Sequence, residues 1–330
     1  MVDVLRPPPL LDPSAAAYKD WLHLNLFDPT SGAIGICNAS LHGAPSDPRS
    51  LVIGAALVHL ADLGWVGNVE VAGFREARIG TASIALERVA IGTDGDARVL
   101  ASALLPLDGL HLAVTARART PPIDIEYPTP FGEGWIAWYV LPRLEVRGTL
   151  IAAGRRLELE HATAYHDHNW GRWHWGDDVG WEWGACAATG TTATLVLSRA
   201  TDRSHRIATG ALLHVEIAGE RRVFGAPSLR IHLSGRLATP PRRVPGALAA
   251  LHQDRVAPPL PGRIVVDADD GIDGAEIEFT PRAALQLIAA DPARRGYGFI
   301  HEMVGGFTAR CRIGGRAYDL HGLAVFEYVD

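Results

Sequence analysis

Lysine is almost absent from this sequence: of its 31 basic residues, 30 are arginine and Lys19 is the one lysine. Such a bias is typical of a GC-rich genome, but it also has a chemical consequence. Pyridoxal-phosphate enzymes, Schiff-base aldolases and P-loop NTPases all need a lysine at a defined place in the site. Lys19 lies in Ala-Tyr-Lys-Asp-Trp, with no glycine-rich loop before it. These three enzyme classes are therefore excluded.

Cysteine and long apolar runs are also scarce. Cys37, Cys186 and Cys311 are far apart and odd in number, which predicts neither a disulfide framework nor a structural zinc site. The most apolar stretch, residues 51–66, carries a histidine and an aspartate and falls short of a membrane span. No basic segment followed by an apolar core precedes it, so no secretory signal is predicted. We expect a cytoplasmic protein without a transmembrane segment, for which peripheral membrane contact stays open.

An excess of positive charge and the common catalytic motifs are missing too. The formal net charge is -6, so nucleic acid is not an expected partner. The sequence has no Gly-x-Ser-x-Gly elbow, Gly-x-Gly-x-x-Gly loop or His-Glu-x-x-His pair. Serine hydrolases, dinucleotide oxidoreductases and zincins therefore have no support. We expect no cofactor and no bound metal, apart from one metal alternative described below.

Glycine and proline, by contrast, are plentiful, at 35 and 22 residues, and they separate short apolar runs. Residues 147–161 form two such runs around Gly154, with Leu157 and Leu159 alternating against charged neighbours. Similar runs recur at 193–197, 211–217, 230–233, 263–266 and 275–279. This spacing predicts a mainly β protein built from antiparallel barrels or sandwiches.

Few helices are expected, and the domain division is placed near the middle of the chain. Residues 245–253 and 281–290 are predicted to be short helices, the second with a proline in its first turn. Strand-like sequence continues beyond the proline-rich stretch 239–261, which therefore predicts an insertion or lid-like loop. We divide the chain into two β domains, residues 1–172 and 173–330, with a margin of about 20 residues.

The tryptophans gather in one place: seven of the nine lie between Trp135 and Trp183. Five of them fall in residues 165–184, YHDHNWGRWHWGDDVGWEWG, together with three histidines and four acids. If residues 165–170 form a strand, its side chains alternate between two faces. One face then carries Tyr165, Asp167 and Asn169, and the other carries His166, His168 and Trp170. By the same alternation, Trp181 and Trp183 share a face opposite Glu182.

The first hypothesis makes Asp167 a general acid that burial among aromatic rings keeps protonated. Desolvation raises the pKa of a carboxyl by up to about 3–5 units. Tyr165 and Asn169 would position the acid, and the tryptophans would stabilise a cationic intermediate by about 0.5–2 kcal/mol each. Such a site favours an apolar polyene over a phosphate or carboxylate substrate. The side chains expected to contact substrate are Trp135, Trp138, Trp170, Trp181, Trp183, His166 and His168.

Other interpretations of the same segment stay open. His166 and His168 could bind a metal, with His174 or Asp177 as a third ligand, because i, i+2 spacing on a strand permits it. The tryptophan-rich ribbon could instead be core packing between two sheets, with Asp167 and the following amide satisfying backbone groups at a strand end. A third alternative is a binder of an apolar small molecule without catalytic activity.

A motif Tyr-x-Asp-x-Asn-x-Gly runs from Tyr165 to Gly171, and Trp181-Glu182-Trp183 follows it. In this motif the sequence resembles the hydroxyneurosporene synthase family, the carotenoid 1,2-hydratases, and their wider lipocalin-like relatives. The wider group includes tocopherol-cyclase-like and Diels–Alderase-like proteins. The resemblance implies two lipocalin-like β domains and a pocket for an apolar substrate. It also implies protonation of an alkene, with Asp167 as the proton donor and Tyr165 as its partner.

We therefore expect a cofactor-independent hydratase, cyclase or isomerase that acts on an isoprenoid-like or other apolar molecule, as in carotenoid biosynthesis. The alternatives are a lipocalin-like binder and a metal-dependent enzyme using His166 and His168. The sequence leaves open which substrate binds, whether water or carbon captures the cation, and how many subunits assemble.

Overall fold

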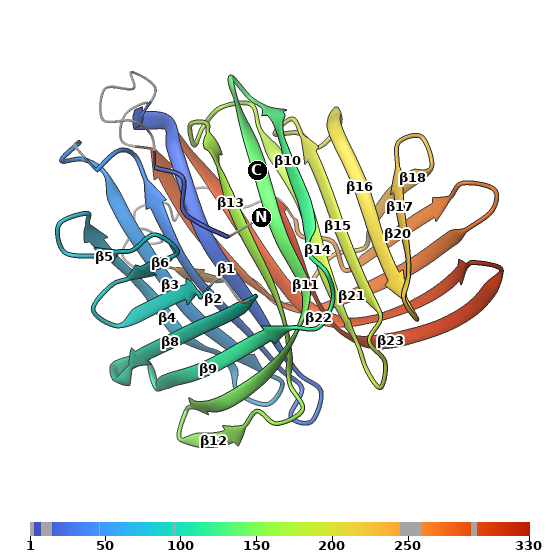
Figure 1. The fold of residues 1–330 in the computed structure, drawn as a ribbon, viewed down its shortest axis with the longest axis horizontal. Coiled ribbons are helices and arrows are strands. Elements are labelled where there is room, and N and C mark those ends of the chain that lie inside the picture. Colours follow the sequence, from blue (N-terminus) through green and yellow to red (C-terminus); the bar gives the residue numbers. More distant parts are fainter. Residues whose placement is uncertain (1–2, 8–14, 46, 95–96, 245–258, 292–295) are drawn as a thin grey trace. The chain divides into compact units, whose positions relative to one another are not determined.

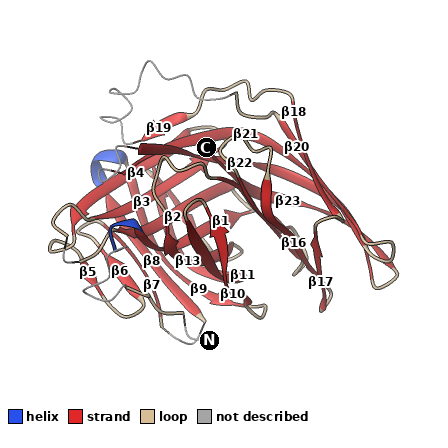
Figure 2. Cartoon of the chain, turned by 90° about the horizontal axis from the view of Figure 1, so that it is seen from above, coloured by secondary structure: helices blue, strands red, loops and turns tan. Residues whose placement is uncertain are grey.

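The computed structural model describes residues 3–7, 15–45, 47–94, 97–244, 259–291 and 296–330, and these residues are nearly all in strands (Figures 1 and 2). The chain forms two compact units. The first unit comprises Met1–Asp177 and Asp291–Gly296, and the second comprises Asp178–Ala290 and Tyr297–Asp330. Each unit is built on its own mainly antiparallel sheet, which curls into a barrel-like form.

The first unit holds a sheet of 13 strands in the order β4-β3-β2-β1-β13-β11-β9-β8-β7-β6-β5, with β10 and β12 also paired to β11. The sheet folds over so that β7 packs against β2 and β3. Its strands are β1 (Tyr18–Asp28), β2 (Ala33–His42), β3 (Leu51–Leu60), β4 (Gly64–Gly73), β5 (Arg78–Ile79), β6 (Ser83–Ala85), β7 (Val89–Thr93), β8 (Arg98–Leu105), β9 (Leu110–Ala118), β10 (Ile123–Phe131), β11 (Gly134–Ala152), β12 (Arg155–Glu158) and β13 (Thr163–Arg172).

The strands of this sheet differ in burial: some have one buried face, and others have two. Along β8 and β9, buried and exposed residues alternate strictly, so one face meets the core and the other meets solvent. Along β1 and β13, nearly every residue is buried, so both faces of these two strands are covered. The inward face includes Leu22, Leu24 and Leu141, which belong to the hydrophobic core of the unit. Polar side chains on β13 are therefore shielded from water whichever way they point.

The second unit holds a sheet in the order β17-β16-β15-β14-β23-β22-β21-β20-β18, with β19 paired in parallel to β21. Apolar side chains in its interior line a cavity of about 20 Å³, which is room for about one water molecule. Its strands are β14 (Gly180–Ala188), β15 (Thr194–Thr201), β16 (Ala208–Ile217), β17 (Glu220–Gly225), β18 (Leu229–Ser234), β19 (Arg242–Val244), β20 (Arg263–Asp269), β21 (Gly274–Asp291), β22 (Gly296–Ile313) and β23 (Arg316–Val329).

The predicted mainly β fold is confirmed, and the short apolar runs at 211–217, 230–233, 263–266 and 275–279 fall on β16, β18, β20 and β21. The predicted helix at 281–290 is wrong, because these residues continue β21. Their alanines and leucines favour a helix in isolation, but pairing with the neighbouring strands overrides that preference. The predicted helix at 245–253 lies outside the described residues.

Helices are short in the described part of the chain. They are the two 3-10 turns η1 (Ala15–Ala17) and η2 (Pro106–Asp108). Among these residues, no helix has the length and hydropathy to cross a membrane.

Candidate functional site

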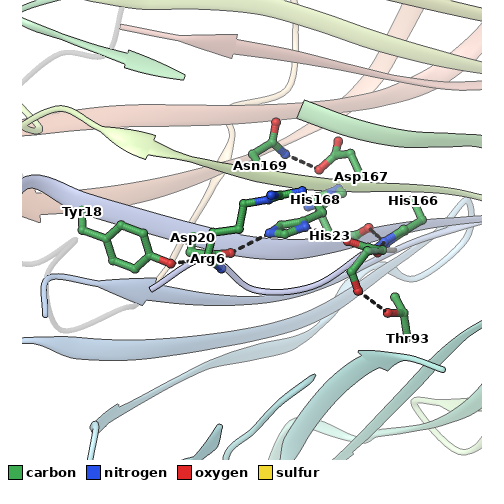
Figure 3. A network of polar contacts seen from close by, with 10 residues as sticks. Arg6, Tyr18, Asp20, His23, Thr93, His166, Asp167, His168 and Asn169 are labelled. Atoms are coloured by element: carbon green, nitrogen blue, oxygen red, sulfur yellow. Dashed lines mark hydrogen bonds and ion pairs between the residues drawn. The ribbon is translucent and has the colours of Figure 1, made fainter. Parts of the chain in front are cut away.

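The predicted motif lies on β13, at the centre of the sheet in the first unit, between β1 and β11. The predicted strand at 165–170 is confirmed, and so is its alternation. Figure 3 shows Asp167 and Asn169 on one side of β13 and His166 and His168 on the other. The two faces carry different chemistry, and both are buried.

The Asp167 face holds an acid and an amide in contact. Asn169 donates a hydrogen bond from its side-chain amide to Oδ1 of Asp167. The two residues are 6% and 3% exposed, and Tyr165 on the same face is 1% exposed. Tyr165, Asp167 and Asn169 are thus brought together, as the alternation predicts. The acid and the amide are therefore held away from bulk water.

The neighbouring strands place aromatic and imidazole side chains beside this pair. In the antiparallel register, Asn169 lies opposite Trp21 on β1 and Trp138 on β11. Asp167 lies opposite His23 on β1. Directly opposed side chains have their Cβ atoms about 4.5–5.5 Å apart, so these residues line one surface. Trp138 was predicted to contact substrate, whereas Trp21 and His23 were not singled out.

The sequence around Trp21 and His23 does contain a pattern that predicts a strand. Residues 21–26 read Trp-Leu-His-Leu-Asn-Leu, a strict alternation that predicts a strand with one apolar face. The leucines do enter the core, and the polar side chains take the face shared with Asp167. Which distant strand pairs with this one does not follow from the alternation, so the local pattern alone does not identify the site.

His23 is a neutral imidazole in this arrangement. Burial lowers its pKa to about 4. The side-chain amide of Asn38 lies 3.3 Å from Nδ1, and an NH2 group can only donate, so Nδ1 accepts and Nε2 carries the proton. A proton donor of fixed tautomer therefore lies in the strand position opposite Asp167.

The opposite face of β13 carries a network of charged groups inside the first unit (Figure 3). His168 lies between two carboxylates, with Nδ1 2.6 Å from Asp3 and Nε2 2.8 Å from Asp20. Burial alone would lower the pKa of His168, but the hydrogen bonds to Asp20 and Asp3 outweigh it and raise the pKa to about 9. His168 is therefore an imidazolium at neutral pH, and it donates from both nitrogens.

His166 shares one of these carboxylates. Its Nε2 lies 2.9 Å from Oδ2 of Asp3, and its Nδ1 lies 2.7 Å from the backbone carbonyl of His23. Burial acts to raise the pKa of Asp3, but the hydrogen bonds from His166 and His168 hold it well below its usual value. Asp3 is therefore a buried anion.

Three further groups complete the network. Tyr18 donates its hydroxyl to Asp20, and the backbone N–H of Arg6 donates to the same carboxylate over 2.8 Å. The Arg6 guanidinium lies 4.4 Å from the ring centroid of Trp170, which in turn lies 4.9 Å from the ring of His168. Trp170 therefore belongs to the charged network and lies on the face opposite Asp167.

In the structure, the ring nitrogens of His166 and His168 bond to the carboxylates of Asp3 and Asp20 and to one backbone carbonyl. Each ring nitrogen has an acceptor within 2.9 Å. The third ligands considered above are engaged elsewhere: His174 bonds Asp291 through Nδ1 at 2.8 Å, and its backbone N–H donates to Asp177. Within the residues that the structure describes, no group of three histidine, cysteine or acidic side chains is placed to hold a metal ion.

The other predicted tryptophans are divided between faces and units. Trp135 packs against the core of the first unit, on the face away from Asp167. Trp181 and Trp183 belong to the second unit, where Trp181 donates its indole N–H to Glu327, and burial raises the pKa of that carboxyl. Glu182 faces the other way and bonds Arg199 at 2.7 Å, as the predicted alternation of β14 requires.

Comparison with known proteins relates the fold to solved structures. No protein-family model matches the chain, and no curated protein matches its sequence. The AttH-like protein NE1406 of Nitrosomonas europaea superposes with a TM-score of 0.67 at 16% identity, over 98% of this chain and 96% of that one. Kievitone hydratase from Nectria haematococca gives a TM-score of 0.62 at 13% identity, over 99% of this chain and 94% of that one.

CghA with Sch210972 gives a TM-score of 0.62 at 12% identity, over 96% of this chain and 89% of that one. At these identities the similarity concerns the fold, and it extends over nearly the whole of each chain. The chain therefore has the same fold as these three solved structures.

Proposed function

We propose that this protein is a hydratase, cyclase or isomerase that starts its reaction by protonating an alkene, with Asp167 as the proton donor. The observation that carries the proposal is the buried Asp167–Asn169 pair, flanked by Trp21 and Trp138 on the adjacent strands. The likeness in fold to kievitone hydratase supports the same class of chemistry. Metals and redox cofactors have no part in the proposed reaction.

The first step transfers the carboxyl proton of Asp167 to one carbon of a C=C bond. The π electron pair forms the new C–H bond, the adjacent carbon becomes a cation, and Asp167 becomes a carboxylate. In a hydration, water bonds to the cation and returns a proton to Asp167. In a cyclisation, a second C=C bond attacks the cation, and in an isomerisation a neighbouring carbon loses its proton; in both, a proton returns to Asp167.

The surrounding residues suit these steps. Asn169 occupies one oxygen of Asp167 and orients the carboxyl toward the strand face. Trp138 and Trp21 offer ring faces, which stabilise a nearby cation by about 0.5–2 kcal/mol each. Tyr165 lies on the same face and completes the wall of the site. The residues beside Asp167 and Asn169 on this face, Trp21, Trp138 and Tyr165, are aromatic, which favours an apolar substrate.

The substrate class follows from this wall and from the resemblance to the carotenoid 1,2-hydratases. We infer an isoprenoid-like alkene. Its protonation gives a tertiary cation, and aromatic rings stabilise such a cation. Hydration, cyclisation and isomerisation share this first step and differ in what then happens to the cation.

Isotope labelling tests the proposal. The protein is incubated with linear isoprenoid alkenes in D2O, and in H2¹⁸O, and the products are examined by mass spectrometry. Protonation of the alkene places deuterium on carbon in all three reactions, and hydration alone adds ¹⁸O. If the alkenes quench tryptophan fluorescence but no deuterium enters carbon, the protein is a binder of apolar molecules and the enzyme proposal is wrong.

A further inference from the structure

In the charged network on the inward face of β13, one carboxylate bonds to two histidine rings. The two oxygens of Asp3 bind different rings: Oδ1 lies 2.6 Å from Nδ1 of His168, and Oδ2 lies 2.9 Å from Nε2 of His166. Asp3 is 7% exposed, and both imidazoles are fully buried. Two N–H groups thus converge on one planar carboxylate, the geometry by which proteins bind organic acids.

The two rings are oriented by groups other than Asp3. The backbone carbonyl of His23 fixes His166 through Nδ1 at 2.7 Å, and Asp20 fixes His168 through Nε2 at 2.8 Å. Asp20 is itself held by the hydroxyl of Tyr18. The ring nitrogens that face Asp3 are therefore aimed at one point by contacts that do not involve Asp3, which makes the site preorganised.

Asp3 reaches this point from outside the sheet. Residues 3–7 form no strand, and their backbone is held by bonds to the sheet: Leu5 donates to the carbonyl of Thr81 at 2.8 Å, Arg6 donates to Asp20 at 2.8 Å, and the Thr93 hydroxyl donates to the carbonyl of Asp3 at 3.0 Å. The carboxylate is thus supplied by a tethered segment to a receptor formed by the sheet. A tether raises the effective concentration of its ligand to about the millimolar range or above.

We propose that His166 and His168 form a carboxylate-binding site inside the first unit, that Asp3 is its internal ligand, and that a small organic monocarboxylate binds there once the Asp3 carboxylate is withdrawn. The site goes beyond the proposed reaction, because it lies on the face of β13 opposite Asp167. A monocarboxylate in this place makes the two contacts that Asp3 makes, with one oxygen on Nδ1 of His168 and the other on Nε2 of His166.

Chemical rescue tests this proposal. Asp3→Gly removes a CH2–COO⁻ fragment, whose equivalent in solution is acetate, and Asp3→Ala leaves room for formate. We expect both variants to unfold at lower temperature than the wild type. Acetate should raise the Tm of Asp3→Gly, and formate that of Asp3→Ala, saturably and by about 2–5 °C at tenfold excess over the Kd. Chloride at equal ionic strength should raise the Tm of neither variant, and acetate and formate should not raise the Tm of the wild type.

Asp47→Gly is the matched control, because Asp47 pairs with the exposed Arg49 away from this network. The proposal is overturned if acetate leaves Asp3→Gly unchanged, or if it stabilises Asp3→Gly, Asp47→Gly and the wild type alike. If Asp3→Gly and Asp3→Ala do not fold, Asp3→Asn is used in their place, because it keeps the shape of the side chain. In that variant, ¹⁵N NMR should show the pKa of His168 falling from about 9 toward its usual value; an unchanged titration would equally reject the site.

Discussion

Asn169 donates its side-chain amide to the carboxyl of Asp167, the residue two positions earlier on the same face of β13. A hydrogen bond between residues i and i+2 on one strand fixes the orientation of both groups without help from a loop. Because both are buried, the bond is not exchanged with water. The amide thus holds one oxygen of the carboxyl in place.

This relationship predicts a change in pH dependence when the amide becomes a second acid. Asn169→Asp places two carboxyls in contact, and like charges disfavour ionisation of the second one. We expect the pH at which turnover is lost to rise by roughly one unit or more. The measurement is kcat against pH for the two proteins. A variant that loses thermal stability but keeps the wild-type pH profile would show that Asn169 has only a structural role.

Trp138 should contribute to the rate through its ring face. If it stabilises a cation by about 0.5–2 kcal/mol, Trp138→Leu lowers kcat by about twofold to thirtyfold, and Trp138→Phe lowers it less. Trp65→Leu is the control, because Trp65 lies on the edge strand β4 against His59. Equal losses in Trp138→Phe and Trp138→Leu would argue against stabilisation by the ring.

The charged network predicts a loss of stability on the alkaline side. The pKa of His168 is raised in the folded protein, to about 9 from 6.5. Its contribution is therefore fully present below pH 6.5 and is lost as the pH rises through 9, on the order of 3 kcal/mol in total. We expect His168→Gln to be less stable than the wild type at pH 6 and to converge with it by pH 9.5.

Denaturant unfolding at a series of pH values measures this difference. Lys19, whose pKa burial lowers to about 8, titrates in both proteins and cancels when the two are compared. His111→Gln, at an exposed position on β9, is the control and should parallel the wild type. A gap between His168→Gln and the wild type that stays constant from pH 6 to 9.5 would contradict the assignment of a buried imidazolium.

Most of the correct predictions rest on the alternation of side chains between the two faces of a strand. The strand at 165–170 and its two faces follow from a period of two, as does the common face of Trp181 and Trp183. The helix predicted at 281–290 failed because alanine and leucine have high helix propensity, while the neighbouring strands impose an extended backbone.

Long-range pairing is the part that the sequence could not predict. Trp21 and His23 lie more than 140 residues before the residues they face, and only the pairing of β1 with β13 brings them there. Asp3 lies further still, 163 residues from His166. No local pattern marks it as a partner of the two histidines, because its segment forms no strand and has no periodicity.

Replacement of the proposed proton donor tests the central claim most directly. Asp167→Asn keeps the size of the side chain and a carbonyl to accept the Asn169 amide, but it removes the acidic proton. We expect turnover of an isoprenoid alkene, followed as deuterium incorporated into carbon in D2O, to fall by about 10²–10⁴-fold. Tm and fluorescence quenching by substrate should stay close to wild-type values, as in the control Asp47→Asn. Wild-type turnover in Asp167→Asn would contradict the account.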